Sequence, residues 1–137
     1  MADVVFFYGT LMAPFRRAGR AQLDEHLKPV GRGTIQAALF DLGIYPAAVP
    51  SQEATVRGEV YEILDASTVL AELDAIEGFR MDEPERSLYV RVKAPVSLDD
   101  GGKVEAWVYF YNAPLGRAEL IASGDYLEHL KGNQQPM

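Results

Sequence analysis

Residues 88–111 read LYVRVKAPVSLDDGGKVEAWVYFY, and this stretch decides the fold class. Apolar and polar side chains alternate from Leu88 to Val96, and a second β-rich run extends from Val104 to Tyr111. The two runs are separated by Asp99-Asp100-Gly101-Gly102, a turn of the Asp-Gly type. This pattern predicts an antiparallel hairpin.

The two strands of this hairpin differ in their faces. In the first strand, alternation places Leu88 and Val92 on an apolar face and Tyr89 and Arg91 on a polar face, so we expect the apolar face to be buried. In the second strand, Trp107, Tyr109 and Tyr111 share one face, and the other face holds Val104, Ala106, Val108 and Phe110. We therefore expect both faces of the second strand to be covered.

The rest of the chain alternates between β-rich and helical stretches. The expected elements are a strand over 4–8 that is buried on both faces, a helix over 15–27, strands over 33–42 and 55–63, and short helical segments over 117–122 and 126–130. Gly58, inside one strand, marks a bulge or a close backbone approach. The set predicts an α+β domain over residues 1–130, a small, partly closed β-barrel with flanking short helices, followed by a flexible tail over 131–137.

A short helix between residues 65 and 78 carries the main candidate for chemistry. Asp65 is a candidate N-cap, apolar residues recur at helical spacing, and Gly78 supplies the stop. Glu77 falls between Leu70 and Leu73 on the apolar stripe, so its carboxylate is predicted to point inward. The helix C-terminus and partial burial both favour a raised pKa for Glu77, which suits a general base. Alternatively, Glu77 turns out to solvent or caps a neighbouring backbone group.

A glycine-bearing bend ends the first strand at Tyr8-Gly9-Thr10-Leu11. Glycine lets the backbone approach a ligand closely, so the amides around Thr10 and Leu11 are candidates for binding a carboxylate or an oxyanion. The alternative is an ordinary turn at a strand end. Tyr89 is a candidate for hydrogen bonding to a small polar ligand, whereas Tyr109 is expected to be a covering residue.

Composition excludes several classes of protein. The 137-residue chain has no cysteine, which excludes disulfides and thiolate metal sites, and its two histidines, His26 and His129, are expected on the surface. The net charge of −7 disfavours nucleic acid as a partner. The chain shows neither a signal peptide nor an apolar run of membrane-spanning length, so we expect a cytoplasmic protein without a membrane partner.

Several short motifs occur in an order that resembles a known family. They are Tyr8-Gly9-Thr10-Leu11, Tyr45-Pro46-Ala47, Gly58-Glu59-Val60-Tyr61, Leu73-Asp74-Ala75-Ile76-Glu77-Gly78, Tyr89-Val90-Arg91 and Ser123-Gly124-Asp125-Tyr126. The chain resembles the gamma-glutamylcyclotransferase-like superfamily, including its gamma-glutamylamine cyclotransferases. The resemblance implies a small mixed barrel and an enzyme that releases 5-oxoproline and a free amine or amino acid from a gamma-glutamyl compound.

The same resemblance implies roles for particular residues. It makes Glu77 the general acid/base and makes the bend formed by Tyr8, Gly9, Thr10 and Leu11 the part that cradles the substrate. It also places Tyr89 in the pocket and gives Tyr126 a substrate-binding position. Neither a cofactor nor a metal is required by this chemistry.

Two questions stay open at this level. A non-catalytic module that binds a small metabolite with the same fold is the alternative to an enzyme. The leaving amine and the oligomeric state are not defined by the sequence. Substrate preference is uncertain because the segment Met12-Ala13-Pro14 and the acidic loop from Arg80 to Arg86 depart from the family pattern.

Overall fold

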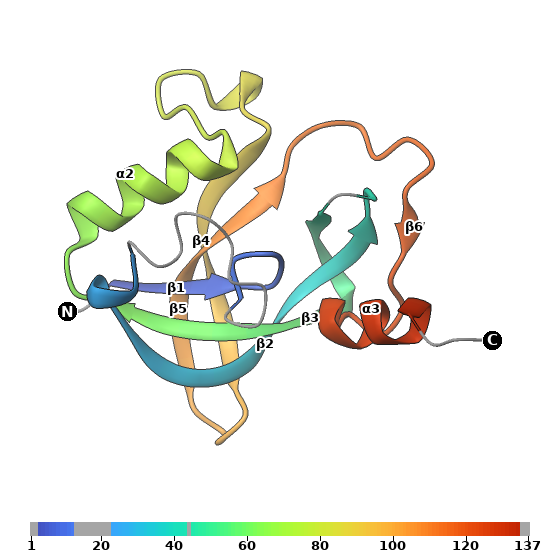
Figure 1. Ribbon diagram of the computed structural model, residues 1–137, viewed down its shortest axis with the longest axis horizontal. Helices are drawn as coiled ribbons and strands as arrows, with labels where there is room; N and C mark the ends of the chain where they lie inside the picture. Colours follow the sequence, from blue (N-terminus) through green and yellow to red (C-terminus); the bar gives the residue numbers. More distant parts are fainter. Residues whose placement is uncertain (1–2, 13–22, 44, 135–137) are drawn as a thin grey trace.

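The computed structural model describes residues 3–12, 23–43 and 45–134 (Figure 1). In chain order the elements are β1 (Asp3–Phe7), the 3-10 turn η2 (Asp24–His26), β2 (Leu27–Asp41), β3 (Pro46–Ile63), α2 (Ala66–Glu77), the 3-10 turn η3 (Pro84–Arg86), β4 (Tyr89–Leu98), β5 (Lys103–Tyr111), β6 (Glu119–Leu120) and α3 (Tyr126–Gln134).

Five of the strands form a closed, mixed barrel. The order across the sheet is β3-β1-β5-β4-β2-β6, and an additional pairing of β3 with β2 closes the ring. β1 runs parallel to β5, whereas the other pairs of neighbours are antiparallel. The short strand β6 extends the edge of β2. The predicted α+β barrel is therefore confirmed, and it closes fully.

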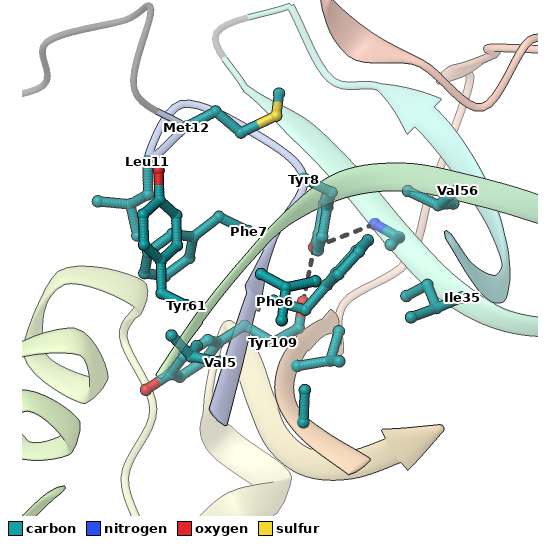
Figure 2. Close-up of a cluster of buried hydrophobic side chains, with 14 of the residues drawn as sticks. Val5, Phe6, Phe7, Tyr8, Leu11, Met12, Ile35, Val56, Tyr61 and Tyr109 are labelled. Carbon is teal, nitrogen blue, oxygen red and sulfur yellow. Dashed lines mark hydrogen bonds between the residues drawn. The ribbon is translucent and has the colours of Figure 1, made fainter. Parts of the chain in front are cut away.

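The first strand is buried on both faces, as predicted. Val5, Phe6 and Phe7 are all almost completely inaccessible to solvent. β1 lies between β3 and β5 in the sheet. Figure 2 shows side chains on both sides of β1, with Ile35 and Val56 on one side and Tyr61 on the other side. Successive side chains of a strand point to opposite faces, so an unbroken apolar run fits this position.

Gly58 allows two strands to come together in the barrel wall. A Cβ atom at this position would collide with the carbonyl oxygen of Phe7 and would lie 2.6 Å from the Phe6 ring. The β2–β3 register shifts lie elsewhere, near residues 29–31 and 36–37. Gly58 thus marks the predicted close approach of backbones and not a bulge.

Helix α2 forms where the sequence predicts it. The Thr68 amide donates to the Asp65 carboxylate at 3.3 Å, which caps the helix N-terminus. Gly78 ends the helix in the left-handed conformation with φ 71°. Val69 and Leu73 are fully buried and attach α2 to the barrel, and Figure 1 shows α2 lying beside β1.

The predicted β4–β5 hairpin is present, but burial does not follow one face of its first strand. Val96, on the predicted apolar face, is fully buried, whereas Val92 on the same face is 38% exposed. Tyr89, on the face predicted to be polar, is buried. The prediction is therefore wrong for the first half of the strand, where Arg91 forms an ion pair with Asp74 of α2.

Three other predictions are corrected in part. Residues 15–22 of the expected 15–27 helix lie outside the described residues, and its end is wrong because Asp24–His26 form a 3-10 turn and Leu27 begins β2. The helical segment expected over 117–122 is wrong, since β6 pairs there with the open edge of β2. Helix α3 is present and continues to Gln134, past the predicted domain boundary at 131.

Candidate active site

A cavity of about 530 Å³, counting its open mouth, lies between the end of β1 and the end of α2. It is lined by residues 6–11, 45–46, 76–77 and 88–89 and by Tyr109. Five segments that are distant in sequence therefore meet around one space.

Glu77 lies in the wall of this cavity. It is the last residue of α2 and is partly buried, as its place on the apolar stripe predicts. Gly78 ends the helix immediately after it, and the amides of Gly78 and Phe79 both donate to the Asp74 carbonyl. The helix end is thus closed by backbone hydrogen bonds, and the Glu77 side chain borders the cavity.

The glycine-bearing bend forms another part of the wall. The Met12 amide donates to the Gly9 carbonyl at 3.0 Å, which closes a tight turn. A Cβ atom on Gly9 would lie 2.9 Å from Cγ of Pro46, so only glycine fits against that ring without displacement. Thr10 and Leu11 line the cavity, with Leu11 buried. The four residues predicted to cradle a substrate therefore do border the site.

The hydroxyls of Tyr8 and Tyr89 form hydrogen bonds to the backbone in the walls of the cavity. Tyr8 donates to the Tyr109 carbonyl at 2.6 Å and accepts from the Ala48 amide at 3.3 Å (Figure 2). Tyr89 donates to the Pro46 carbonyl at 2.8 Å. Both tyrosines line the cavity as predicted, but each hydroxyl proton is directed to a backbone carbonyl.

The same surroundings keep these two phenols protonated. Burial, followed by the charge of Glu77, raises the pKa of Tyr8 far above its ordinary value. Burial also raises the pKa of Tyr89, with smaller contributions from Tyr8 and Glu77. Neither phenol can therefore act as a base at neutral pH, which leaves the carboxylate of Glu77 as the basic group of the cavity wall.

Tyr45 is a cavity residue that the sequence reasoning did not select. Its ring lies 6.0 Å from the ring of Tyr89, measured between centroids, and it is partly exposed. Within the described part of the chain, no hydrogen bond from the Tyr45 hydroxyl is found, unlike those of Tyr8, Tyr89 and Tyr109. Its place beside Pro46 in the motif Tyr45-Pro46-Ala47 was the available signal.

Tyr126 does not line the cavity, although it was predicted to bind substrate. It is buried at the start of α3, and burial followed by the charge of Asp41 raises its pKa. The Ser-Gly-Asp turn before it attaches α3 to the barrel, because the Arg57 amide donates to the Gly124 carbonyl at 2.7 Å. The motif is therefore placed to hold a helix and not to border the cavity.

The histidines also differ from expectation in one case. His129 on α3 is largely buried and contacts the Asp41 carboxylate at 2.9 Å, so its prediction as a surface residue is wrong. This hydrogen bond is the main cause of a lowered pKa for Asp41. His26 is more exposed and lies 3.4 Å from Glu25. Among the described residues, no group of three or more metal-binding side chains is assembled.

These features define a class of protein: a small closed β-barrel whose cavity is bordered by a helix-end carboxylate and a glycine-bearing bend. The gamma-glutamyl cyclotransferase, AIG2-like family model matches residues 5–128. The chain therefore belongs to this gamma-glutamylcyclotransferase-like family, as the sequence motifs predict.

Curated relatives match along nearly their whole length. The gamma-glutamylcyclotransferase family protein YtfP of Escherichia coli (strain K12) is 36% identical over 128 residues, which cover 93% of this chain and 98% of the relative. The protein of the same name from Citrobacter rodentium is 35% identical over 125 residues, covering 90% of this chain and 95% of the relative.

Solved structures share the fold. The solution structure of E. coli YtfP has a TM-score of 0.66 at 35% identity and covers 92% of this chain and 97% of that one. YkqA from Bacillus subtilis has a TM-score of 0.72 at 26% identity. The match covers 100% of this chain but only 45% of YkqA. The family model and the curated relatives support an enzyme of the gamma-glutamylcyclotransferase kind. No helix in the described residues is long and apolar enough to cross a membrane.

Proposed function

We propose that this protein is a gamma-glutamyl cyclotransferase that releases 5-oxoproline and a free amine or amino acid from a gamma-glutamyl compound. The observation that carries the proposal is the position of Glu77, a partly buried carboxylate in the wall of a cavity formed largely by aromatic and apolar side chains. A carboxylate in such a place is suited to proton transfer, and family membership gives the reaction class.

The reaction needs a bent substrate and three proton transfers. Glu77 takes a proton from the α-ammonium of the gamma-glutamyl group, and the freed amine nitrogen attacks the γ-carbonyl carbon. A carbon–nitrogen bond forms and closes the five-membered ring, while negative charge develops on the carbonyl oxygen. The attacking nitrogen now carries one proton too many and loses it to water. Glu77 returns the first proton to the leaving nitrogen as the carbonyl re-forms and the original amide bond breaks. Holding the bent conformer makes the attack intramolecular, which lowers the entropic part of the barrier.

The bend at residues 8–11 is proposed to orient the substrate. Thr10 and Leu11 border the cavity, and Gly9 brings this backbone against Pro46. Backbone amides placed at a ligand stabilise a carboxylate or a developing oxyanion. In this proposal Tyr89 shapes the cavity beside them, and neither metal nor cofactor takes part. The net charge of −7 supports a small-molecule substrate and not nucleic acid, and a cytoplasmic location stays a prediction.

The function is tested by incubating the protein with a panel of gamma-glutamyl compounds and measuring 5-oxoproline by mass spectrometry. The panel holds gamma-glutamyl dipeptides, a gamma-glutamyl-lysine crosslink and gamma-glutamyl polyamines. We expect turnover of at least one compound and its loss by at least about 100-fold in Glu77→Gln, which keeps the shape of the side chain but not its basicity. Glu72→Gln, on the exposed face of the same helix, is the matched control and is expected to keep full activity.

Two results would contradict the proposal. A Glu77→Gln variant with most of the wild-type turnover would remove the assigned role of this residue. Binding of a gamma-glutamyl compound by calorimetry without turnover of any compound would instead favour a non-catalytic binding module of the same fold.

A further inference from the structure

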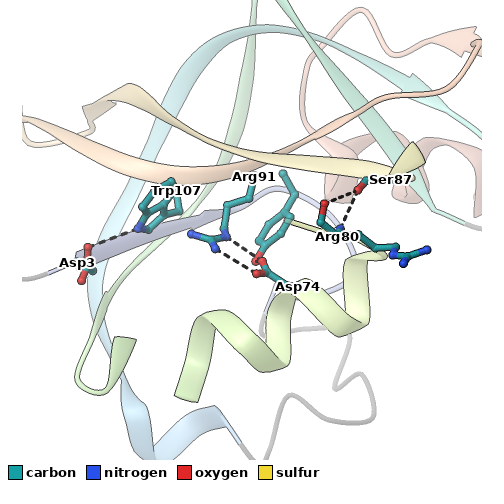
Figure 3. A network of polar contacts seen from close by, with 7 residues as sticks. Asp3, Asp74, Arg80, Ser87, Arg91 and Trp107 are labelled. Atoms are coloured by element: carbon teal, nitrogen blue, oxygen red, sulfur yellow. Dashed lines mark hydrogen bonds and ion pairs between the residues drawn. The ribbon is translucent and has the colours of Figure 1, made fainter. Parts of the chain in front are cut away.

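Helix α2 carries a second carboxylate three residues before Glu77, and this one is tightly held. The Asp74 carboxylate accepts two hydrogen bonds from the Arg91 guanidinium, from Nε at 2.8 Å and from a terminal nitrogen at 3.1 Å. It also accepts one from the Tyr109 hydroxyl at 2.6 Å. Figure 3 shows this network between α2, in the lower part of the view, and the strands above it. Three hydrogen bonds from two strands therefore fix one side chain of the helix.

The cation of this network is fixed as firmly as the anion. The Arg91 side chain is only 7% exposed, and its guanidinium lies 4.5 Å from the centre of the Trp107 ring. The Trp107 indole nitrogen in turn donates a hydrogen bond to the Asp3 carboxylate at 3.4 Å. Planar guanidinium groups favour two parallel bonds to a carboxylate and stacking on an aromatic face. Arg91 thus has little freedom to leave Asp74.

Tyr109 connects this network to the cavity. Its side chain lines the cavity, its hydroxyl donates to Asp74, and its carbonyl accepts the hydrogen bond from Tyr8. Residues three apart on a helix lie on neighbouring positions of its surface, so Asp74 and Glu77 are close. Asp74 and Glu77 therefore occupy neighbouring positions on α2, and Asp74 attaches this part of the helix to β4 and β5.

We propose that Asp74 and Arg91 are positioning residues that hold Glu77 over the cavity and balance the charge beside it. The inference rests on the proposed function, in which Glu77 exchanges protons with the substrate. Arg91 neutralises Asp74, so Glu77 experiences an ion pair instead of a lone like charge one helical turn away.

The titratable and charged groups around Glu77 support this assignment. In the described residues they are Tyr8 at the end of β1, Tyr45 before β3, Tyr89 and Arg91 on β4, Tyr109 on β5, Asp74 on α2, and Arg80 and Glu83 in the following loop. Burial raises the pKa values of Tyr8, Tyr89 and Tyr109, which keeps these phenols neutral at pH 7. Arg80 lies 3.7 Å from Glu83. Asp74, three residues before Glu77 on α2, is paired with the opposite charge of Arg91.

Removing either member of the pair alone has opposite electrostatic consequences. Arg91→Gln leaves the negative charge of Asp74 beside Glu77, which disfavours ionisation of Glu77 and raises its pKa. Asp74→Asn leaves the positive charge of Arg91 there, which favours ionisation and lowers the pKa of Glu77. A purely structural role of the pair predicts loss of activity in both variants, without shifts of the Glu77 pKa in opposite directions.

The experiment measures the pH dependence of kcat/KM for wild type, Arg91→Gln, Asp74→Asn and the double variant. The acidic limb of this profile reports the pKa of the base in the free enzyme. We expect the limb to move to higher pH in Arg91→Gln and to lower pH in Asp74→Asn, each by about 0.5 to 1 pH unit. The double variant should return the limb to near its wild-type position, because both charges are removed together.

Arg91→Lys separates charge from geometry. It keeps the positive charge but loses the two parallel hydrogen bonds, so we expect an unchanged acidic limb with a lower kcat. Thermal melting of each variant confirms that the measured population is folded. Should one single variant fail to fold, the direction in which the limb moves in the other single variant still tests the inference.

Different outcomes overturn different claims. Acidic limbs that stay in place, or that move in the same direction in both single variants, would overturn the positioning role while Glu77→Gln remains inactive. Activity that persists in Glu77→Gln would overturn the proposed function itself, and the positioning role with it.

Discussion

Replacing Tyr8 by phenylalanine tests whether the hydroxyl at the bend holds the barrel together. The change removes one oxygen and leaves two buried backbone groups without their partner, the Tyr109 carbonyl and the Ala48 amide. Each buried group that loses its hydrogen bond costs about 1 to 3 kcal/mol. We therefore expect the free energy of unfolding to fall by roughly 2 to 5 kcal/mol.

Urea denaturation followed by circular dichroism measures this loss, with Tyr111→Phe as the matched control. Tyr111 is partly exposed on the same strand as Tyr109, and its replacement is expected to change stability by less than about 0.5 kcal/mol. If Tyr8→Phe is as stable as the control but binds substrate more weakly, the structural assignment is wrong and the Tyr8 hydroxyl contacts substrate directly.

Two further predictions concern the mouth of the cavity and helix α3. Tyr45→Phe should raise KM by about three- to tenfold with little change in kcat, as measured by steady-state kinetics, and an unchanged KM would place its hydroxyl outside the substrate contact. The lowered pKa of Asp41 stabilises the fold above the unfolded-state pKa, and this stability is lost as pH falls through the lower folded pKa. The free energy of unfolding, measured as the pH is lowered below about pH 4, should therefore fall less steeply for Asp41→Asn than for wild type. Equal slopes in the two proteins would contradict the role of the His129 contact.

The elements that sequence analysis predicted correctly are those whose signals are local. Helix α2 combines an N-cap at Asp65, apolar spacing and a terminal Gly78, all within one segment. The β4–β5 hairpin likewise carries its turn and its alternation in one continuous run. Glu77 could be placed at an inward position for the same reason, because helical periodicity fixes its direction relative to Leu73.

The errors arise where distant segments decide the outcome. Tyr89 and Arg91 of β4 are covered by partners distant in sequence, the Pro46 carbonyl for Tyr89 and the Asp74 carboxylate of α2 for Arg91. Periodicity within β4 cannot show such partners. His129 is buried by a partner 88 positions away in sequence. Tyr126 was assigned from the resemblance alone, and the structure uses its helix for packing on the barrel. Each case required knowledge of which strand lies next to which helix.

The parallel pairing of β1 with β5 has a consequence for how this protein is made. Tyr8 and Tyr109 are 101 positions apart, yet their hydrogen bond joins two walls of the cavity. Contacts between such distant segments form slowly during folding, because a long loop must be ordered first. During synthesis β1 can pair with β3 first, but the contact of Tyr8 with Tyr109 forms only after β5 has left the ribosome. A nascent chain that stops before residue 109 therefore lacks one wall of the cavity.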